Sequence, residues 1–341
     1  MIHTNFTLLN NSRLTFGLPH IPTGLTDHQY SSEFVQHRNL AINSIVGQGG
    51  SFPVLPFPEI HPYKLSYPLN SDYSIYFIGT FPPPSYFRDL PVLNALPNLM
   101  INGKTIVRPK IPFYHGNDCT LWQLLNPIFP QDITVANRNT VKDSVIQYLH
   151  QKQLNYFDVI EECQRKSYNS NDSSLFNVIP NSKGISSIME NDNDDCWLIF
   201  NTSSTFNSAG LKFDQNGNYK PSKQSFGIFL DVLIQLNFNL AFSLDGISWH
   251  STSNNLGRIW IQSNLKYKVL FYLKVNEKIF TIVTGPSPSG AANIRLGGNS
   301  CYQRYLNGIL PADYQPNINS FKSYVYRMAI AKNRNALIQL N

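Results

Sequence analysis

The sequence predicts an α/β protein with three layers, in which helices cover both faces of a central, mainly parallel sheet. Short apolar runs rich in β-branched and aromatic residues are typical of buried strands, and segments with helical spacing separate them. Three of these runs end in loops of Gly, Pro, Ser or Asn, and parallel sheets bind their ligands at such strand ends. The predicted strands are Tyr73–Ile78, Trp197–Asn201, Lys268–Lys274 and Lys278–Thr284.

The predicted helices lie between these strands and after them. Residues 121–125 have the spacing of a short amphipathic helix. Residues 143–165 show helical spacing in two pieces, VKDSVIQYLHQ and YFDVIEECQR. Two further helices are expected at 226–238 and, with basic character, at 320–340, and the segment VNE is expected to form the turn between the last two strands.

Composition divides the chain into three parts. Residues 1–70 are rich in Pro, Gly, His and aromatic residues without a sustained period, which predicts an irregular N-terminal extension lying on the core. Residues 71–300 form the expected α/β domain, with an insertion at about 208–265. Residues 301–341 are predicted to be a basic helical segment that packs on this domain.

Charge and cysteine usage narrow the classes of function. Hydrophobic residues make up 42% of the 341 residues, which indicates a globular chain, and the formal charge of +6 favours a polyanionic partner. The start lacks a signal-peptide pattern, and no apolar run approaches the ~20 residues of a membrane-spanning helix, so a cytoplasmic protein without a membrane partner is expected. The four cysteines form no CxxC pair and no Gly-rich nucleotide loop is present, so neither metal nor cofactor is expected.

Three predicted strand ends carry polar or rigid residues in a definite order. They read GTFPPPS after the first strand, NTSSTF after the second and TGPSPSG after the last. Because the carboxyl ends of parallel strands meet at one edge of a sheet, we expect these segments to form one site.

In this order the motifs resemble those of the uracil-DNA glycosylase superfamily. Its members show a first strand ending in G-x-x-P, a middle strand ending in Asn and a last strand followed by a Pro-Ser loop. The matching segments here are Gly79–Pro82, Asn201 and Gly285–Ser289. The resemblance implies a sheet of uracil-DNA glycosylase type over roughly residues 73 to 295, without the insertion.

Two more segments are similar to the branch that includes the mismatch-specific and hypoxanthine-acting enzymes. One is FYHGNDCTLWQLL, which leads from aromatic residues to a Trp. The other is FDVIEECQRKSYNSND, with Asp158, Cys163 and Arg165 in register.

The resemblance implies a role for each motif. A glycosylase flips a nucleotide out of the stack, holds the edge of its base and stabilises the base as a departing anion. Asn201 offers both a donor and an acceptor to a base edge, although its side chain could instead cap the turn NTSST. Phe81 is expected to stack on the base. Base contacts are assigned to Asn201, Phe81, Tyr86 and Thr80, and DNA contacts to Ser287, Ser289, Gly290, Arg295, Ser85 and Arg165.

The water-positioning residue departs from the pattern of several branches. They carry Asp or Asn as the third residue of the first motif, where this chain has Phe81. The hypoxanthine-acting branch also lacks a polar residue there and uses an Asn before the Trp of the second segment, a position that falls on Cys119 in ungapped register. The resemblance therefore implies that Asp118 or Asn117, just before it, positions the attacking water, with Asp158 as the alternative carboxylate. Both expectations have a non-catalytic alternative. Asn117 and Asp118 could belong to a solvated HGND turn, and Asp158 could occupy the N-terminus of a helix without a catalytic role.

The last motif departs as well. Several branches begin it with a His that donates to the departing base, and this chain has Thr284–Gly285 there. A missing donor of this kind costs about 2.7–4 kcal/mol of transition-state stabilisation unless a backbone N–H or the Thr hydroxyl replaces it.

These motifs predict a monofunctional DNA glycosylase that hydrolyses the bond to a deaminated or otherwise modified base and leaves an abasic site. Candidate bases are uracil, hypoxanthine or a hypermodified pyrimidine such as phage DNA carries. The alternative is a binding protein of the same fold that recognises modified DNA and has lost catalysis. We expect a nucleoid-associated monomer acting on single- or double-stranded DNA. Basic residues expected either to contact phosphates or to form a solvated face are Arg295, Arg304, Lys322, Arg327, Lys332 and Arg334.

Overall fold

A computed structural model gives the fold of the chain. The structure describes residues 59–61, 67–81, 100–101, 104–105, 111, 113–114, 120–130, 133–134, 136–165, 175–201, 213–217, 224–288, 300–308 and 317–341.

Within this part of the chain the central element is a mixed sheet of seven strands in the order β10-β9-β11-β12-β8-β2-β5. β2, β5 and β8 are buried along their whole length, which is typical of strands covered on both faces. The strands are β2 (Ile75–Gly79), β5 (Leu154–Asp158), β8 (Cys196–Phe200), β9 (Leu240–Ser243), β10 (His250–Ser251), β11 (Leu270–Val275) and β12 (Lys278–Thr284).

The sheet divides into a parallel and an antiparallel half. β12, β8, β2 and β5 are parallel neighbours, and these are the strands that carry the sequence motifs. β11 pairs antiparallel with β12 because the turn at Asn276–Glu277 reverses the chain, and β9 and β10 continue the antiparallel half. The expectation of a mainly parallel sheet is therefore correct only for the half that carries the motifs.

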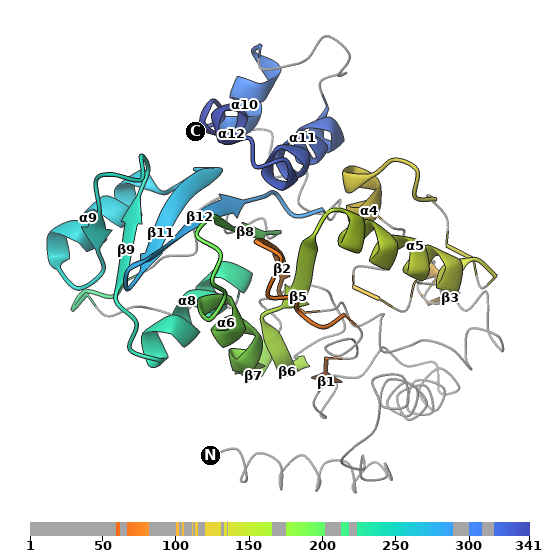
Figure 1. The fold of residues 1–341 in the computed structure, drawn as a ribbon, viewed down its shortest axis with the longest axis horizontal. Helices are drawn as coiled ribbons and strands as arrows, with labels where there is room; N and C mark the ends of the chain where they lie inside the picture. Colours follow the sequence, from red (N-terminus) through yellow and green to blue (C-terminus); the bar gives the residue numbers. More distant parts are fainter. Residues whose placement is uncertain are drawn as a thin grey trace, which may run out of the picture.

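Helices lie on both faces of this sheet, as the α/β interpretation expects. Figure 1 shows α10, α11 and α12 on one side of the sheet and α6 and α8 on the other. α11 packs on α4 and against β8, and α6 packs on α8. The helices are α4 (Thr120–Leu125), α5 (Arg138–Gln151), α6 (Ser182–Met189), α8 (Ser225–Gln235), α9 (Asn255–Asn264), α10 (Ser300–Leu306), α11 (Ile318–Ile330) and α12 (Arg334–Ile338).

The second piece of the predicted helix at 143–165 is wrong. The first piece is α5, but the chain then forms β5 and, after Val159, the strand β6 (Ile160–Arg165). Val159 N donates to Gly79 O at 3.1 Å and Ile160 N to Thr80 O at 3.2 Å, so the backbone finds its partners on the chain of β2 and not within a helix. A short apolar run has no periodicity that separates a buried strand from a buried helix.

A smaller sheet joins the N-terminal region to the domain. It has the order β1-β6-β7, in which β1 (Glu59–Ile60) and β7 (Leu175–Pro180) flank β6. Residues 59–61 of the predicted extension thus belong to the fold. A separate two-stranded sheet pairs β3 (Met100–Ile101) with β4 (Lys104–Thr105).

The other two predicted parts also contribute to the domain. β9 and β10, from the segment predicted as an insertion, extend the central sheet beyond β11. The basic helix predicted at 320–340 is two helices, because Lys332 takes a positive φ of 52° and Asn333 caps the N-terminus of α12. Ser323 Oγ donates to Leu124 O at 2.6 Å, which ties α11 to α4.

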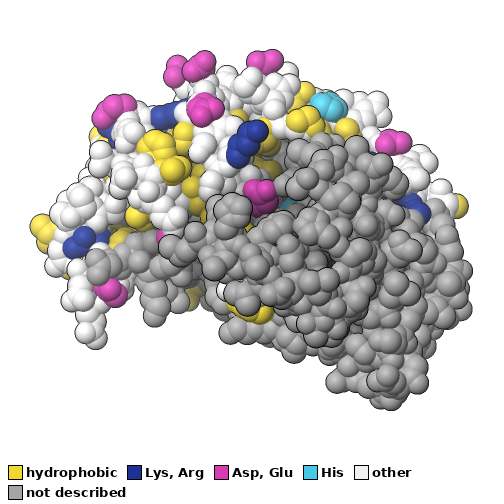
Figure 2. Space-filling view, turned by 90° about the horizontal axis from the view of Figure 1, so that it is seen from below, with side chains coloured by type: hydrophobic (Ala, Val, Ile, Leu, Met, Phe, Trp, Pro, Cys, Tyr) yellow, Lys and Arg dark blue, Asp and Glu magenta, His cyan; other side chains and the backbone are white. Residues whose placement is uncertain are grey.

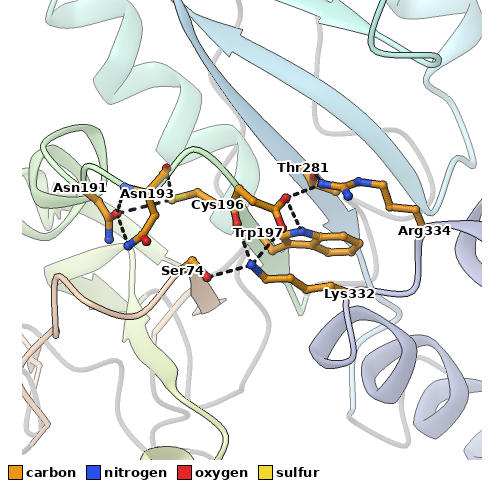
Figure 3. Close-up of polar contacts among 9 residues, drawn as sticks. Ser74, Asn191, Asn193, Cys196, Trp197, Thr281, Lys332 and Arg334 are labelled. Carbon is orange, nitrogen blue, oxygen red and sulfur yellow. Dashed lines mark hydrogen bonds and ion pairs between the residues drawn. The ribbon is translucent and has the colours of Figure 1, made fainter.

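The C-terminal helices are also fastened to the amino ends of the parallel strands (Figure 3). Lys332 Nζ donates to Ser74 Oγ at 2.8 Å, just before β2, and to Asp195 Oδ2 at 3.0 Å, just before β8. Arg334 also binds Asp195, and its guanidinium carbon lies 5.0 Å from the centre of the Trp197 ring. We call Ser74, Asp195, Lys332 and Arg334 the amino-end clasp.

The clasp changes the interpretation of the basic C-terminal residues. Lys332 and Arg334 lie at the edge of the sheet opposite to the carboxyl ends of β2 and β8 and are engaged with Asp195, so they do not face a ligand bound at those carboxyl ends.

Two other basic residues of this region lie outside the clasp. Lys322 is buried, and burial lowers its pKa to about 8. Arg304 Nη1 donates to the backbone oxygen of Leu340 at 2.7 Å.

The clasp makes the stability depend on Asp195. Partial burial by itself raises the pKa of Asp195, but hydrogen bonds from Lys332 and Trp197 and the charges of Lys332 and Arg334 outweigh it and lower the pKa below 3.8. A carboxyl whose pKa is lower in the folded chain stabilises it above the ordinary pKa, and this contribution is lost as the pH falls through the folded value.

We expect Asp195→Ala to lower the free energy of unfolding by about 1 kcal/mol near neutral pH, the modest size typical of a half-exposed ion pair. The difference from the wild type should shrink as the pH falls below about 4. Urea unfolding at both pH values measures it. Asp194→Ala, at the exposed neighbouring carboxylate, is the matched control, and equal unfolding midpoints for the two variants at neutral pH would contradict the clasp.

Candidate functional site

The candidate site lies at the carboxyl ends of the parallel strands. From β2 the chain passes to β5 on one side of it, and the next parallel strand, β8, then joins β2 on the other side. In open α/β sheets a ligand binds outside the carboxyl ends of the strands at such a reversal of strand order. The strand order therefore points to the ends of β2 and β8, independently of any motif.

The backbone keeps these strand ends together beyond the strands themselves. Asn201 N donates to Ile78 O at 3.1 Å, and Gly285 N donates to Phe200 O at 2.9 Å. Thr80 and Asn201 are buried, with 5% and 3% of their surface exposed. Residues at the start of the three predicted segments, Thr80, Asn201 and Gly285, therefore lie at the same edge of the sheet, and the first two segments beyond positions 81 and 201 lie outside the described residues.

A buried carboxylate stands at the end of β5. Asp158 Oδ2 lies 3.0 Å from His61 Nε2, and each of these two side chains is 2% exposed. The other oxygen, Oδ1, has no hydrogen-bond partner among the residues that the structure describes. It lies against Gly79, where an added Cβ would stand 2.0 Å from it. Glycine at position 79 thus makes room for the carboxylate.

His61 follows β1 and is held from several directions. Its backbone N donates to Glu161 O at 2.8 Å, which continues the pairing of β1 with β6. Its ring meets Phe81 edge-on with centroids 5.6 Å apart, and it lies 5.1 Å from the ring of Tyr114. Aromatic rings therefore contact the imidazole that binds Asp158.

Asn201 points toward a second buried polar side chain, Tyr156. Asn201 Nδ2 donates to Tyr156 Oη at 3.4 Å. Burial, followed by the negative charge of Asp158, raises the pKa of Tyr156 well above its ordinary value, and these effects outweigh the hydrogen bond from Asn201, which lowers the pKa. The phenol therefore stays protonated at neutral pH and accepts the amide bond as a neutral group.

Aromatic rings surround Tyr156 next to the candidate site. The ring centroid of Tyr156 lies 4.5 Å from that of Tyr114 and 5.5 Å from that of Trp122. The Tyr156 ring also stacks on Phe77, with centroids 5.8 Å apart and an interplanar angle of 11°. Trp122 Nε1 donates to Tyr114 O at 3.1 Å, so the segment before α4 is fixed against β5. Phe81, at the end of β2, is 7% exposed.

The loop after β12 is fixed by α11. Tyr326 Oη donates to Pro286 O, and a Cβ at Gly285 would meet the Tyr326 ring at 2.3 Å. Thr284 is fully buried, and its hydroxyl donates to Lys268 O at 2.6 Å. The expectation that this hydroxyl could replace the missing histidine is therefore wrong, because the sheet already uses its hydrogen.

The structure brings together four of the predicted site residues, Asp158, Asn201, Phe81 and Thr80. Ser287 lies three residues after the end of β12. Arg165 lies at the end of β6 in the smaller sheet, where the structure describes only its backbone. The remaining predicted site residues lie outside the described part of the chain; they are Asn117, Asp118, Tyr86, Ser85, Ser289, Gly290 and Arg295.

Two residues of the site were missed by the sequence reasoning, and one expectation for Asp158 is wrong. Asp158 ends a strand and does not begin a helix. Had residues 154–158 been interpreted as a strand, the period of two would have placed Tyr156 and Asp158 on one face. His61 carries no such signal, because it stands in a Pro-rich segment without periodicity.

The described residues give little sign of other binding chemistry. No group of three or more His, Cys, Asp or Glu that could hold a metal occurs among them, and none of the described helices is long and apolar enough to span a bilayer. Figure 2 shows separate basic and acidic side chains among hydrophobic and neutral ones on the described part of one face, so charge alone does not mark a phosphate-binding surface there.

Comparison with known proteins adds no relative. No family model matches the chain, and no significant match was found among curated proteins or solved structures.

Gly79→Ala tests the packing of the carboxylate. The new methyl group should clash with Asp158 Oδ1 and lower the free energy of unfolding by about 1–3 kcal/mol, as overpacking does. Asp158→Ala removes the carboxyl group, and Tyr156 Oη, 3.3 Å from the new Cβ, is then the nearest of the three atoms that surround it in the wild type. Gly79→Ala should therefore have a much smaller effect in the Asp158→Ala background. Urea unfolding of the four proteins measures this coupling, and equal losses in both backgrounds would contradict it.

Proposed function

We propose that this chain is a monofunctional DNA glycosylase that removes a deaminated or otherwise modified base by hydrolysis. The observation that carries the proposal is the meeting of Asp158, Asn201 and Phe81 at the reversal of strand order. This meeting combines a buried carboxylate, an amide and an aromatic ring, which are the groups that N-glycoside hydrolysis and base recognition require. The partner is DNA, and the protein acts as a monomer associated with the nucleoid.

Asp158 is the residue that activates water in this proposal. Its Oδ1 takes a proton from water as the water oxygen bonds to C1′ of the sugar, and the C1′–N bond breaks with its electron pair moving to the base. The base leaves as an anion and takes up a proton from solvent. The sequence reasoning preferred Asn117 or Asp118; the buried position of Asp158 and its Oδ1, unpaired among the described residues, favour Asp158.

Asn201 reads the base edge, and the aromatic side chains hold the face of the base. Asn201 Nδ2 donates to Tyr156 Oη, which orients the amide, and a side-chain amide carries the donor and the acceptor that a bidentate contact to a pyrimidine or purine edge requires. Phe81 provides a ring at the adjacent strand end, and stacking of a base on an aromatic ring contributes about 1–3 kcal/mol.

The test is excision from oligonucleotides that carry uracil, hypoxanthine, a G·T mismatch or glucosylated hydroxymethylcytosine. Each is incubated in single- and double-stranded form, and hot alkali then cleaves the abasic sites. We expect strand breaks on at least one substrate. Asp158→Asn should lower the single-turnover rate by about 100-fold or more, because it removes the carboxylate that acts as the general base. Asn201→Ala should abolish detectable excision. Because both residues are buried, thermal melting of each variant must show a folded chain.

Two variants serve as controls. Asn335→Ala changes an exposed amide on α12 and Asp231→Asn a carboxylate on α8; both should keep the wild-type rate. Full activity of Asp158→Asn or Asn201→Ala would refute the assigned roles. Retarded bands without alkali-labile breaks on every substrate would overturn the enzyme and support the alternative of a modified-DNA-binding protein.

A further inference from the structure

His61 reaches the candidate site from a distant part of the sequence. It stands 97 residues before its partner Asp158. The pairing of β1 with β6, in which Glu59 faces Cys163 and Ile60 faces Glu162, carries the chain to the corner between β5 and β6. The strand β1 has two residues, and the buried contact that follows it is the pair of His61 with Asp158.

We infer that His61 is a positioning residue for Asp158: it holds the carboxylate through Oδ2 so that Oδ1 alone faces the reacting water. The inference rests on the proposed function, because it assigns His61 a part in the same hydrolysis. It also makes β1 and the residue that follows it a part of the functional unit.

The geometry of the pair determines what His61 does. An ionised carboxylate only accepts hydrogen bonds, so at 3.0 Å Nε2 must carry the hydrogen that lies between the two side chains. This hydrogen bond fixes the rotation of the carboxylate about the Cβ–Cγ bond of Asp158. With Oδ2 held by His61, Oδ1 lies against Gly79 at the end of β2. The next two residues of the chain, Thr80 and Phe81, belong to the candidate site.

The surroundings of His61 keep the imidazole from turning away. Phe81 meets the ring edge-on, Tyr114 lies against it at a tilt of 39°, and the backbone of His61 is fixed by Glu161. A carboxylate buried without a partner on either oxygen would lose its hydration with no compensation. His61 compensates one oxygen and leaves the other for chemistry.

In the hydrolysis His61 keeps its proton. The proton of water goes to Asp158 Oδ1, the C1′–O bond forms and the C1′–N bond breaks, while the hydrogen on Nε2 remains between His61 and Oδ2. His61 therefore acts only through Asp158. This makes the effects of replacing the two residues non-additive, as expected for groups that work as one unit.

The first experiment is a double-mutant cycle under single-turnover conditions. His61→Phe removes the donor, and we expect its rate at saturating enzyme to fall by about 100-fold with little change in DNA affinity, since it misorients a general base. His61→Gln keeps a side-chain N–H and should recover most of that loss. In the Asp158→Asn background, His61→Phe should have little further effect.

His250→Phe is the matched control. His250 also contacts an aromatic ring, because it stacks on Trp260 with ring centroids 3.7 Å apart, but it lies on β10, at the opposite end of the sheet from β5 and Asp158. It should keep the wild-type rate. A wild-type rate in His61→Phe, or additive losses in the cycle, would overturn the inference, and melting temperatures separate either result from unfolding.

A second measurement does not depend on activity. In ¹⁵N-labelled protein, NMR should find His61 protonated at Nε2, with a hydrogen protected from exchange that becomes exposed to exchange in Asp158→Asn but not in Asp231→Asn. An unprotonated Nε2 at neutral pH would overturn the inference. If the wild-type protein cleaves no substrate, the proposed function and the catalytic part of the inference both fail, and this spectrum alone decides whether His61 holds Asp158.

Discussion

The fold depends on the parallel pairing of β2 with β5 on one edge and β8 on the other. A strand buried on both faces must satisfy all of its N–H and C=O groups within the sheet, and β2 does so only because both neighbours align with it. This pairing makes the chain reverse its direction of winding at β2, which places helices on both faces of the sheet (Figure 1). It also brings the ends of three strands together at one edge, where the candidate site lies.

The two edges of the parallel half use polar side chains differently. At the amino ends, the clasp joins Asp195 to Lys332 and Arg334, so its charges neutralise one another and fasten the C-terminal helices. At the carboxyl ends, the polar groups are more deeply buried, and Asp158 keeps one oxygen without a partner among the described residues. A buried carboxylate that is only half satisfied does not add to stability as a closed pair would, and such groups concentrate at functional sites.

The site proposed for glycosidic hydrolysis departs from the pattern that the motifs suggest. Position 81 holds an aromatic ring where several branches of the uracil-DNA glycosylase superfamily hold a polar residue. The last strand leads into Thr284–Gly285, and the sheet uses the hydroxyl of Thr284. The carboxylate and the histidine of the site come from elsewhere, from the end of β5 and from the residue after β1. The chemistry proposed for Asp158 thus needs no polar side chain at position 81.

The sequence by itself determined the α/β class, the strands β2, β8, β11 and β12 to within about two residues, and the meeting of the carboxyl ends of β2, β8 and β12 at one edge of the sheet. These features are local, because a buried strand and the loop that ends it are written in consecutive residues. Tertiary structure alone decided that β9 and β10 extend the sheet beyond β11, the strand identity of residues 154–165 and the place of His61. A short apolar run takes its conformation from its neighbours, and the bond between His61 and Asp158 joins residues that no spacing rule connects.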